Sequence, residues 1–411
     1  MSRATDIGVP ERGLARVLWP LLLVLLLWTA AGAVRAQRLR DFADADSLTL
    51  ALHTRCRWAA LDSVGRAMLR RGTDYPALRR RLGQAALATN RPAEALRHYG
   101  RALRENPLDS AARYGLVLAY LGLNQPAPAV LLARELTAVQ RQALHLNSAE
   151  PLTQVELEAG GQHSDFERRG NAGFVRLGAS SRLSARLSLT LNASYFGQTV
   201  ELPGPPQTGG NEPYPIRQGQ YHALLGVQLA PRWRALLGYD YIHSDFGRLT
   251  PAAGRLGYAA LAHARPYWTA QVGVFAGTLT DSVRVQPDLR LAVYPLGSLR
   301  LYGFGRASVV CSGRRRYPNA VLGAGGRLRP RLWLEAYGGL GPVPVLAELD
   351  GTYVYNQLDP LRRRAGASLL ILLPQHLSWR LSGGAEQRRD AVKNVRLFNV
   401  YSLATAFAWT W

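Results

Sequence analysis

Two copies of one tetrapeptide carry the side chains in this sequence that are best suited to chemistry. The sequence His-Ser-Asp-Phe begins at His163 and again at His243. On a β-strand the histidine and the aspartate of each copy share a face, where they would be able to bind a metal, whereas the serine points away and cannot complete a triad within one copy. We interpret the copies as duplicated hairpin ends, with metal binding as the alternative.

The remaining candidates for catalysis are weak. The eight histidines are otherwise scattered without metal-ligand spacing, and we find no phosphate-binding glycine loop in the right context. Cys56 and Cys311 fall in different predicted domains, so we expect no disulfide between them. We therefore predict no catalytic, cofactor-binding or metal-binding residue, and a protein that is not an enzyme.

Arginine clusters form a second chemical pattern, because they fall in or beside the longer connections of the predicted barrel described below. Guanidinium groups bind phosphate in bidentate fashion. We expect two triplets to contact the phosphates of lipopolysaccharide, and solvated loop charge is the alternative. The clusters are Arg168 and Arg169; Arg314, Arg315 and Arg316; Arg362, Arg363 and Arg364; and Arg388 and Arg389, the two triplets being those at 314–316 and 362–364.

The formal net charge of +22 comes almost wholly from arginine, since Lys393 is the only lysine. In an exported chain this charge favours anionic lipid or acidic polysaccharide as a partner over nucleic acid. Arginine-rich codon usage is the alternative explanation. Charges of both signs also fall on predicted lumen faces, so they either pair and plug the barrel or line a wet pore. That set is Glu156, Glu158, Arg176, Arg186, Asp240, Asp288, Arg290, Arg306, Arg380 and Glu386.

Residues 1–36 have the pattern of a secretory signal peptide. Three arginines precede the apolar run 17–28, and Val34-Arg35-Ala36 offers small residues for cleavage after Ala36. The run is shorter than a spanning helix requires, so an uncleaved anchor is the lesser alternative.

Residues 37–150 are rich in alanine, leucine and arginine, with apolar residues at helical spacing. Within 76–109 the small, aromatic and proline positions match a tetratricopeptide repeat, and a looser unit follows one period later. We predict a periplasmic helical domain that docks a partner protein or braces its neighbour. The residues expected to pack the repeat are Gly83, Ala95, Tyr99, Ala102 and Pro107.

From residue 151 to 411 the apolar period changes to two. In 397–411 large aromatic residues alternate with small ones up to the final Trp411, which predicts a strand of a closed membrane barrel. Short connections at 182–184, 230–232, 265–266, 295–298, 329–330 and 374–376 alternate with longer ones at 162–171, 200–217, 244–254, 280–285, 312–318, 341–361 and 389–396. The alternation predicts an all-β transmembrane barrel of about 14 antiparallel strands, with both ends in the periplasm.

Tryptophans recur at one end of the predicted hairpins. Four follow proline-bearing short turns and two end the last strand, which predicts an aromatic girdle at one membrane interface. A soluble sandwich or propeller is the alternative fold. The girdle set is Trp233, Trp268, Trp333, Trp379, Trp409 and Trp411.

The stretch 350–359, then 364–368 and Glu386-Gln387, resembles the YaiO-type outer-membrane β-barrel proteins, as does the order of signal, helical repeats and barrel. The resemblance implies an outer-membrane location and no assigned reaction. The sequence therefore favours a non-enzymatic outer-membrane pore or surface scaffold, inserted by the barrel-assembly machinery through its C-terminal strand. An export port for an anionic exopolysaccharide and a lipid-modifying enzyme are the alternatives.

Overall fold

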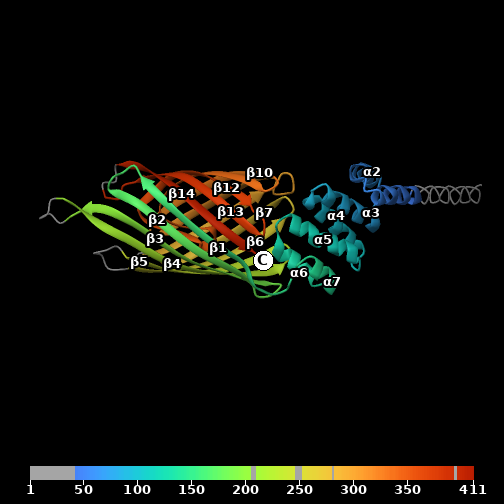
Figure 1. The fold of residues 1–411 in the computed structure, drawn as a ribbon, viewed down its shortest axis with the longest axis horizontal. Coiled ribbons are helices and arrows are strands. Elements are labelled where there is room, and N and C mark those ends of the chain that lie inside the picture. Colours follow the sequence, from blue (N-terminus) through green and yellow to red (C-terminus); the bar gives the residue numbers. More distant parts are fainter. Residues whose placement is uncertain (1–41, 205–209, 246–251, 280–281, 393–395) are drawn as a thin grey trace, which may run out of the picture.

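A computed structural model describes residues 42–411 with gaps at 205–209, 246–251, 280–281 and 393–395. A helical module, residues 42–143, is followed by a closed β-barrel, and the two lie end to end (Figure 1). The expected signal peptide of residues 1–36 lies outside the described residues. No described helix combines the length and the apolar character that crossing a membrane requires.

The helical module stacks antiparallel helices whose ends follow ordinary start and stop chemistry. Proline begins α3, α4 and α6, where the missing amide hydrogen costs nothing. Asn90 and Asn124 adopt φ of 57° and 55° just past α3 and α5, a left-handed conformation that asparagine tolerates. Residues 42–54 are helical, followed by α2 (Trp58–Arg70), α3 (Pro76–Ala88), α4 (Pro92–Glu105), α5 (Ser110–Gly122), α6 (Pro126–Ala133) and α7 (Ala138–Ala143).

Fourteen strands in the described part of the chain confirm the predicted fold class, with η1 as a 3-10 turn between two of them. They are β1 (Glu150–Ser164), β2 (Arg169–Arg182), β3 (Leu187–Pro203), β4 (Asn211–Ala230), β5 (Trp233–Asp245), β6 (Ala252–Arg265), β7 (Trp268–Leu279), β8 (Ser282–Val293), β9 (Leu301–Ser312), β10 (Arg315–Arg329), β11 (Leu332–Glu348), η1 (Leu349–Gly351), β12 (Tyr353–Leu372), β13 (Leu377–Arg389) and β14 (Leu397–Thr410).

Each strand pairs antiparallel with its sequence neighbours, and β1 closes the barrel by pairing with β14. Closure leaves no free edge, so backbone donors and acceptors are satisfied around the whole wall. The register sets Leu157 opposite Phe407, both of which are exposed on the outer surface. The C-terminus lies at the end of the barrel that faces the helices (Figure 1).

The short predicted connections all fall between strands as expected, but several of the longer ones are shorter than predicted. Most of 200–217 is strand, because β3 extends to Pro203 and β4 begins at Asn211. In the stretch 280–285, β8 already begins at Ser282, which pairs with Leu279 at the end of β7. The stretch 312–318 contains only a tight turn at Gly313. The stretch 341–361 is not a loop, because β11 and β12 continue pairing through it as far as Glu348 and Tyr353. Alternating residues in these stretches fit strands as well as loops, and the paired strands satisfy more backbone groups.

Candidate functional site in the barrel lumen

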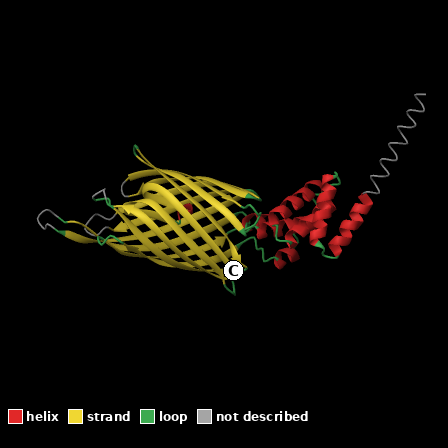
Figure 2. Ribbon diagram, turned by 90° about the horizontal axis from the view of Figure 1, so that it is seen from above, coloured by secondary structure: helices red, strands yellow, loops and turns green. Residues whose placement is uncertain are grey.

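Residues 343–361 form a hairpin, here called the lumen hairpin, that folds into the barrel. The pairing of β11 with β12 is irregular between Leu340 and Val345, which turns the hairpin inward from the wall. Figure 2 shows the red 3-10 turn η1 at the tip of this hairpin, enclosed by yellow strands. Its backbone is constrained, since Leu349, Asp350 and Gly351 have φ of 47°, 61° and 101°.

Polar side chains from four strands hold the tip. Gln220 of β4 donates to the Gly351 carbonyl at 2.9 Å. Tyr258 and Gln271 donate to Asp350 Oδ1 at 2.8 and 2.7 Å, and Arg290 Nη1 lies 2.9 Å from the same oxygen. Tyr258 belongs to β6, Gln271 to β7 and Arg290 to β8. The tip therefore crosses the lumen and reaches the wall opposite its own strands.

A chain of ion pairs holds the hairpin at Glu348, the residue directly before its tip. Glu348 accepts from Arg306 Nη1 at 2.7 Å and from both terminal nitrogens of Arg364, and Arg306 also lies 2.5 Å from Asp288. The four side chains are 13% exposed or less. Removing Glu348 would leave the buried Arg364 guanidinium without its carboxylate partner and Arg306 with Asp288 alone, which is strongly unfavourable.

One face of the lumen hairpin is apolar and packs on an apolar part of the wall. Val345, Ala347 and Val354 form a buried cluster with inward residues of the strands β5 to β7. Those wall residues are Leu236, Ile242, Leu256, Tyr258, Phe275 and Leu279. The inner face of the barrel is therefore not uniformly polar, because the hairpin covers its apolar part and excludes water there.

The base of the hairpin is clamped at the end of the barrel far from the helices. Arg169 Nε lies 2.6 Å from Asp359 and its Nη2 lies 2.9 Å from Asp390, and all three side chains are buried. On the other flank Tyr353 donates to Glu158, and the Arg176 guanidinium lies 5.1 Å from the ring centroid of Tyr353. The hairpin is thus attached along its whole length by polar contacts.

Beside the hairpin, a cavity of about 1290 Å3 remains, lined by residues of β1 to β4 and of β6 to β14. Its lining includes Glu348 and Tyr353 of the hairpin and Asn90 and Asn124 of the helical module. The cavity therefore extends from the hairpin to the mouth that the helices cover.

The helical module contacts the barrel at several turns: Gly297 lies between β8 and β9, Tyr267 between β6 and β7, and Ala185 between β2 and β3. Ala93 N donates to the Gly297 carbonyl at 3.3 Å, and Arg97 donates to the Tyr267 hydroxyl at 3.0 Å with its guanidinium 5.1 Å from the ring centroid. Tyr267 and Ala185 also join the apolar cluster of the helices. The module is held against one side of the mouth.

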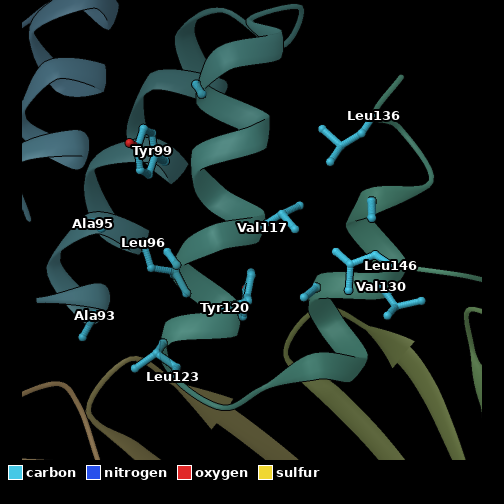
Figure 3. Packing of buried hydrophobic residues seen from close by; sticks show 14 of the residues in the cluster. Ala93, Ala95, Leu96, Tyr99, Val117, Tyr120, Leu123, Val130, Leu136 and Leu146 are labelled. Carbon is cyan, nitrogen blue, oxygen red and sulfur yellow. The ribbon is translucent and has the colours of Figure 1, made fainter. Parts of the chain in front are cut away.

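The predicted repeat residues lie mostly in the helical core. Ala95, Tyr99 and Ala102 are buried, and Figure 3 shows Tyr99 and Val117 where the helices meet. A Cβ placed on Gly83 would lie 2.8 Å from the Tyr99 ring, so this position requires glycine for the observed packing. Pro107 is exposed in the turn after α4.

The six girdle tryptophans divide into five and one. Trp233, Trp268, Trp409 and Trp411 expose about half of their surface, and Trp379 stacks on Phe407 of the same face with centroids 6.0 Å apart. Trp333 differs, because it lines the cavity and its Nε1 donates to the Leu299 carbonyl at 3.3 Å. The expectation for Trp333 was wrong because the exposed Leu334 takes the outward position, and alternation sends its neighbour inward.

The two arginine triplets behave differently. Arg314, Arg315 and Arg316 are all exposed at the turn between β9 and β10. In the second triplet Arg363 is exposed, but Arg364 points into the lumen and binds Glu348. Successive strand residues face opposite sides, so Arg362–Arg364 do not form one outward cluster.

The repeated tetrapeptides do not assemble a site. His163 pairs with Asn171 at 2.8 Å, whereas Asp165 accepts from the backbone and side chain of Asn399. In the second copy Ser244 is buried and receives a hydrogen bond from Asn356 of the hairpin, and Phe246 lies outside the described residues. In the described part of the chain no three histidine, cysteine or carboxylate side chains converge as metal ligands, and Cys56 and Cys311 are both free.

Several residues at the hairpin were not predicted from the sequence. His222, which was not predicted, forms a buried pair at 3.0 Å with the predicted lumen residue Asp240, beside Gly351. Gln286 exchanges two hydrogen bonds with the backbone of Ala347. The sequence signal that indicates such residues is a polar residue between two large apolar or aromatic neighbours that face outward. His222 is an example, since its neighbour Tyr221 is exposed.

Comparison with known proteins bears on the two parts separately. A family model described as tetratricopeptide repeat matches residues 86–148. No curated protein matches the chain. Among solved structures the chain is similar to a mutant of the monoaromatic hydrocarbon channel TodX, at 11% identity, covering 66% of this chain and 94% of the channel with a TM-score of 0.46.

Two further structures are similar at comparable levels. A FadL homologue from Pseudomonas aeruginosa is 8% identical, with 65% of this chain and 93% of the homologue covered and a TM-score of 0.43. A bacterial polysaccharide outer membrane secretin is 12% identical, with 62% and 98% covered and a TM-score of 0.38.

Proposed function

We propose that this protein is a non-enzymatic outer-membrane conduit, closed by its lumen hairpin, whose helical module docks a periplasmic partner over the mouth. The observation that carries this proposal is the contrast inside the lumen. Part of the lumen is filled by a hairpin held through side-chain contacts, and the rest is a cavity that residues of the helical module also line. A barrel that served only as a surface scaffold would gain nothing from a cavity leading to its covered mouth.

The membrane location is part of the same proposal. Large apolar residues on the outer surface, such as Leu157, Leu237 and Leu403, suit contact with lipid. The resemblance to YaiO-type proteins and the signal-like residues 1–36, with cleavage after Ala36, support export to the outer membrane. The C-terminal strand would present the recognition element for the barrel-assembly machinery.

Planar-bilayer conductance of the purified full chain tests the conduit. Replacing residues 343–361 by a short turn should convert a nearly silent barrel into one with large, stable conductance steps, because the replacement removes the obstruction while the pairing of β11 with β12 below Leu340 remains. A deletion variant that folds and stays silent would contradict the proposal.

A milder variant separates opening from loss of the barrel. Glu348→Gln removes the charge that Arg306 and Arg364 share, so brief openings should become frequent. Glu335→Gln serves as the control, since this lumen carboxylate is bonded to Tyr302 and not to the hairpin. Equal behaviour of the two variants would show that the hairpin is not the obstruction.

An export port for an anionic exopolysaccharide is the second candidate, favoured by the arginine and aromatic side chains at the mouth. The remaining alternative, a lipid-modifying enzyme, needs a serine-histidine pair facing the outer leaflet. The buried pair of His222 and Asp240 faces the lumen instead.

We also propose that the exposed Arg314, Arg315 and Arg316 bind lipopolysaccharide phosphate at the rim far from the helices, with Arg362 and Arg363 beside Arg364 as a secondary contact. Converting Arg314–Arg316 to glutamine should reduce the lipopolysaccharide that co-purifies with the protein. Unchanged association would remove this contact. We propose further that the helical module binds a periplasmic protein or a polysaccharide, and we propose no nucleic-acid partner.

A further inference from the structure

A group of five side chains, here called the mouth cluster, lines the cavity where it approaches the helices. The cluster spans β9, β10 and β11, whose registers set Tyr302 opposite Gly325 and Arg327 opposite Trp333. Tyr302 reaches across β10 to donate to Glu335 at 2.8 Å, and glycine at 325 is what allows this, since a Cβ there would lie 2.5 Å from the ring. The cluster consists of Arg300, Tyr302, Arg327, Trp333 and Glu335.

The arginines of the mouth cluster differ from two arginines beside the hairpin, Arg306 of β9 and Arg364 of β12. Arg306 and Arg364 are neutralised by Glu348. Among the described residues no ion pair joins Arg300 or Arg327 to a carboxylate, and the Arg327 guanidinium lies 6.0 Å from the centroid of the Trp333 ring. Positive charge is therefore available at the mouth and cancelled at the hairpin.

Other walls of the cavity add to the same chemistry. Arg380 of β13 has only a 3.9 Å contact with Glu156, and its side chain is 44% exposed. Asn90 and Asn124, at the ends of α3 and α5, line the cavity from the helical module. Both the barrel and the module thus contribute polar groups at one place.

We propose that the mouth cluster binds an acidic saccharide of the uronic type. An indole face suits the apolar C–H face of a pyranose ring, and a guanidinium binds a carboxylate through paired hydrogen bonds. Glu335 and the asparagine amides supply acceptors and donors for hydroxyl groups. The inference rests on the proposed conduit, because it names the class of molecule that the passage admits.

Calorimetric titration of the full chain in detergent with oligogalacturonate tests the site. Arg327→Gln should weaken binding about tenfold, the loss expected for one charge-assisted hydrogen-bonded pair, and Trp333→Phe should weaken it by a smaller factor. Arg329→Gln and Trp379→Phe are the matched controls. Arg329 lies two residues after Arg327 at the end of β10, and Trp379 stacks on Phe407 on the outer face; neither lines the cavity. Neither control should change affinity.

Neutral malto-oligosaccharide and polyglutamate complete the comparison. The uronic ligand should bind at least tenfold more tightly than either. Equal affinities of Arg327→Gln and Arg329→Gln, or tighter binding of polyglutamate, would overturn the assignment, the latter in favour of an acidic peptide.

Conductance separates failure of this site from failure of the conduit. If the hairpin-deleted barrel conducts but oligogalacturonate neither binds nor blocks it, the saccharide site is wrong and the conduit stands. If oligogalacturonate binds with the expected variant pattern and the deleted barrel stays silent, the conduit is wrong and the site stands.

Discussion

Tyr99 determines how closely three helices of the module approach. Its ring lies against Gly83 of α3 and Gly115 of α5, where an added Cβ would sit 2.8 and 2.2 Å from the ring. Gly83→Ala should therefore destabilise the helical module by about 1–3 kcal/mol through overpacking. Gly100→Ala on α4, where an added Cβ meets nothing within 4 Å, should stabilise it by up to about 1 kcal/mol.

Urea unfolding followed by the helical circular dichroism signal measures both glycine variants. Shifts of the midpoint in opposite directions are expected, and shifts in the same direction would show that helix propensity, not contact with Tyr99, controls these positions.

His98 makes the stability of the helical module depend on pH. Burial, with the nearby Arg79 and Arg97, lowers the pKa of His98 from 6.5 to about 4. The folded state therefore resists a proton that the unfolded chain accepts, so stability is full above about pH 6.5 and falls as the pH drops towards 4. The loss is about 1.4 kcal/mol per pH unit in that window.

Unfolding midpoints of the helical signal, measured between about pH 4 and pH 6.5, check this dependence. His98→Gln should flatten it. Carboxylates such as Asp74, whose pKa is lowered by a hydrogen bond from Arg79, act only below about pH 4 and do not interfere. An unchanged slope in the variant would assign the pH dependence to other groups.

At the scale of elements, α4 connects the helical module to the barrel through two turns, the one between β6 and β7, which carries Tyr267, and the one between β8 and β9, which carries Gly297. Arg97→Ala removes the hydrogen bond and the cation–π contact with Tyr267. Hydrogen exchange at the Ala93 amide, which is bonded to Gly297, should accelerate about tenfold as the module detaches more often.

Arg101→Ala is the control for this contact, since Arg101 lies one turn further along α4 and pairs with Glu105 within the module. Equal acceleration in both variants would mean that exchange reports fraying of α4 and not release from the barrel.

The same scale shows what the sequence predicts well. Strand number and the position of the short turns follow from the period of two and from proline-bearing turns, because each strand must alternate between lipid-like and lumen faces. The lumen hairpin was interpreted as a loop because its alternation of Val343, Val345 and Ala347 with other residues does not reveal which barrel face they contact. A strand in the wall and a strand inside the lumen have the same period.

The candidate site was less accessible to sequence reasoning for a related reason. The prediction places the charges of Arg176, Asp288 and Arg306 inside the barrel, as in the structure, but it does not give their partners, and Arg306 pairs with Glu348 of the hairpin. Pairing across a lumen depends on barrel closure and on the inward hairpin. Both bring together residues that are far apart in the sequence, so local spacing does not reveal the pairs.

At the scale of the whole molecule, closure between β1 and β14 and the covered mouth make one enclosed space with an uneven charge distribution. The hairpin contributes Glu348 and Asp350, which neutralise Arg306, Arg364 and Arg290. Replacing residues 343–361 removes these carboxylates. Arg364 then loses its carboxylate partner, and Arg306 and Arg290 share Asp288 alone, so positive charge is added to that of Arg300, Arg327 and Arg380. Cations should then be repelled and anions concentrated in the passage.

The reversal potential of the hairpin-deleted barrel in a potassium chloride gradient measures this selectivity, and it should favour chloride. Adding Arg306→Gln and Arg364→Gln to the deletion should reduce the preference, because two of the exposed charges are lost from the narrow part of the lumen. Adding Arg314→Gln and Arg316→Gln instead, at the outer rim, should change it little, since charges further than about 8 Å are screened at physiological salt. A cation-selective deleted barrel would mean that Glu156, Glu158 and Asp288 dominate the passage once the hairpin is gone, and that the mouth is not the anion-binding end of the molecule.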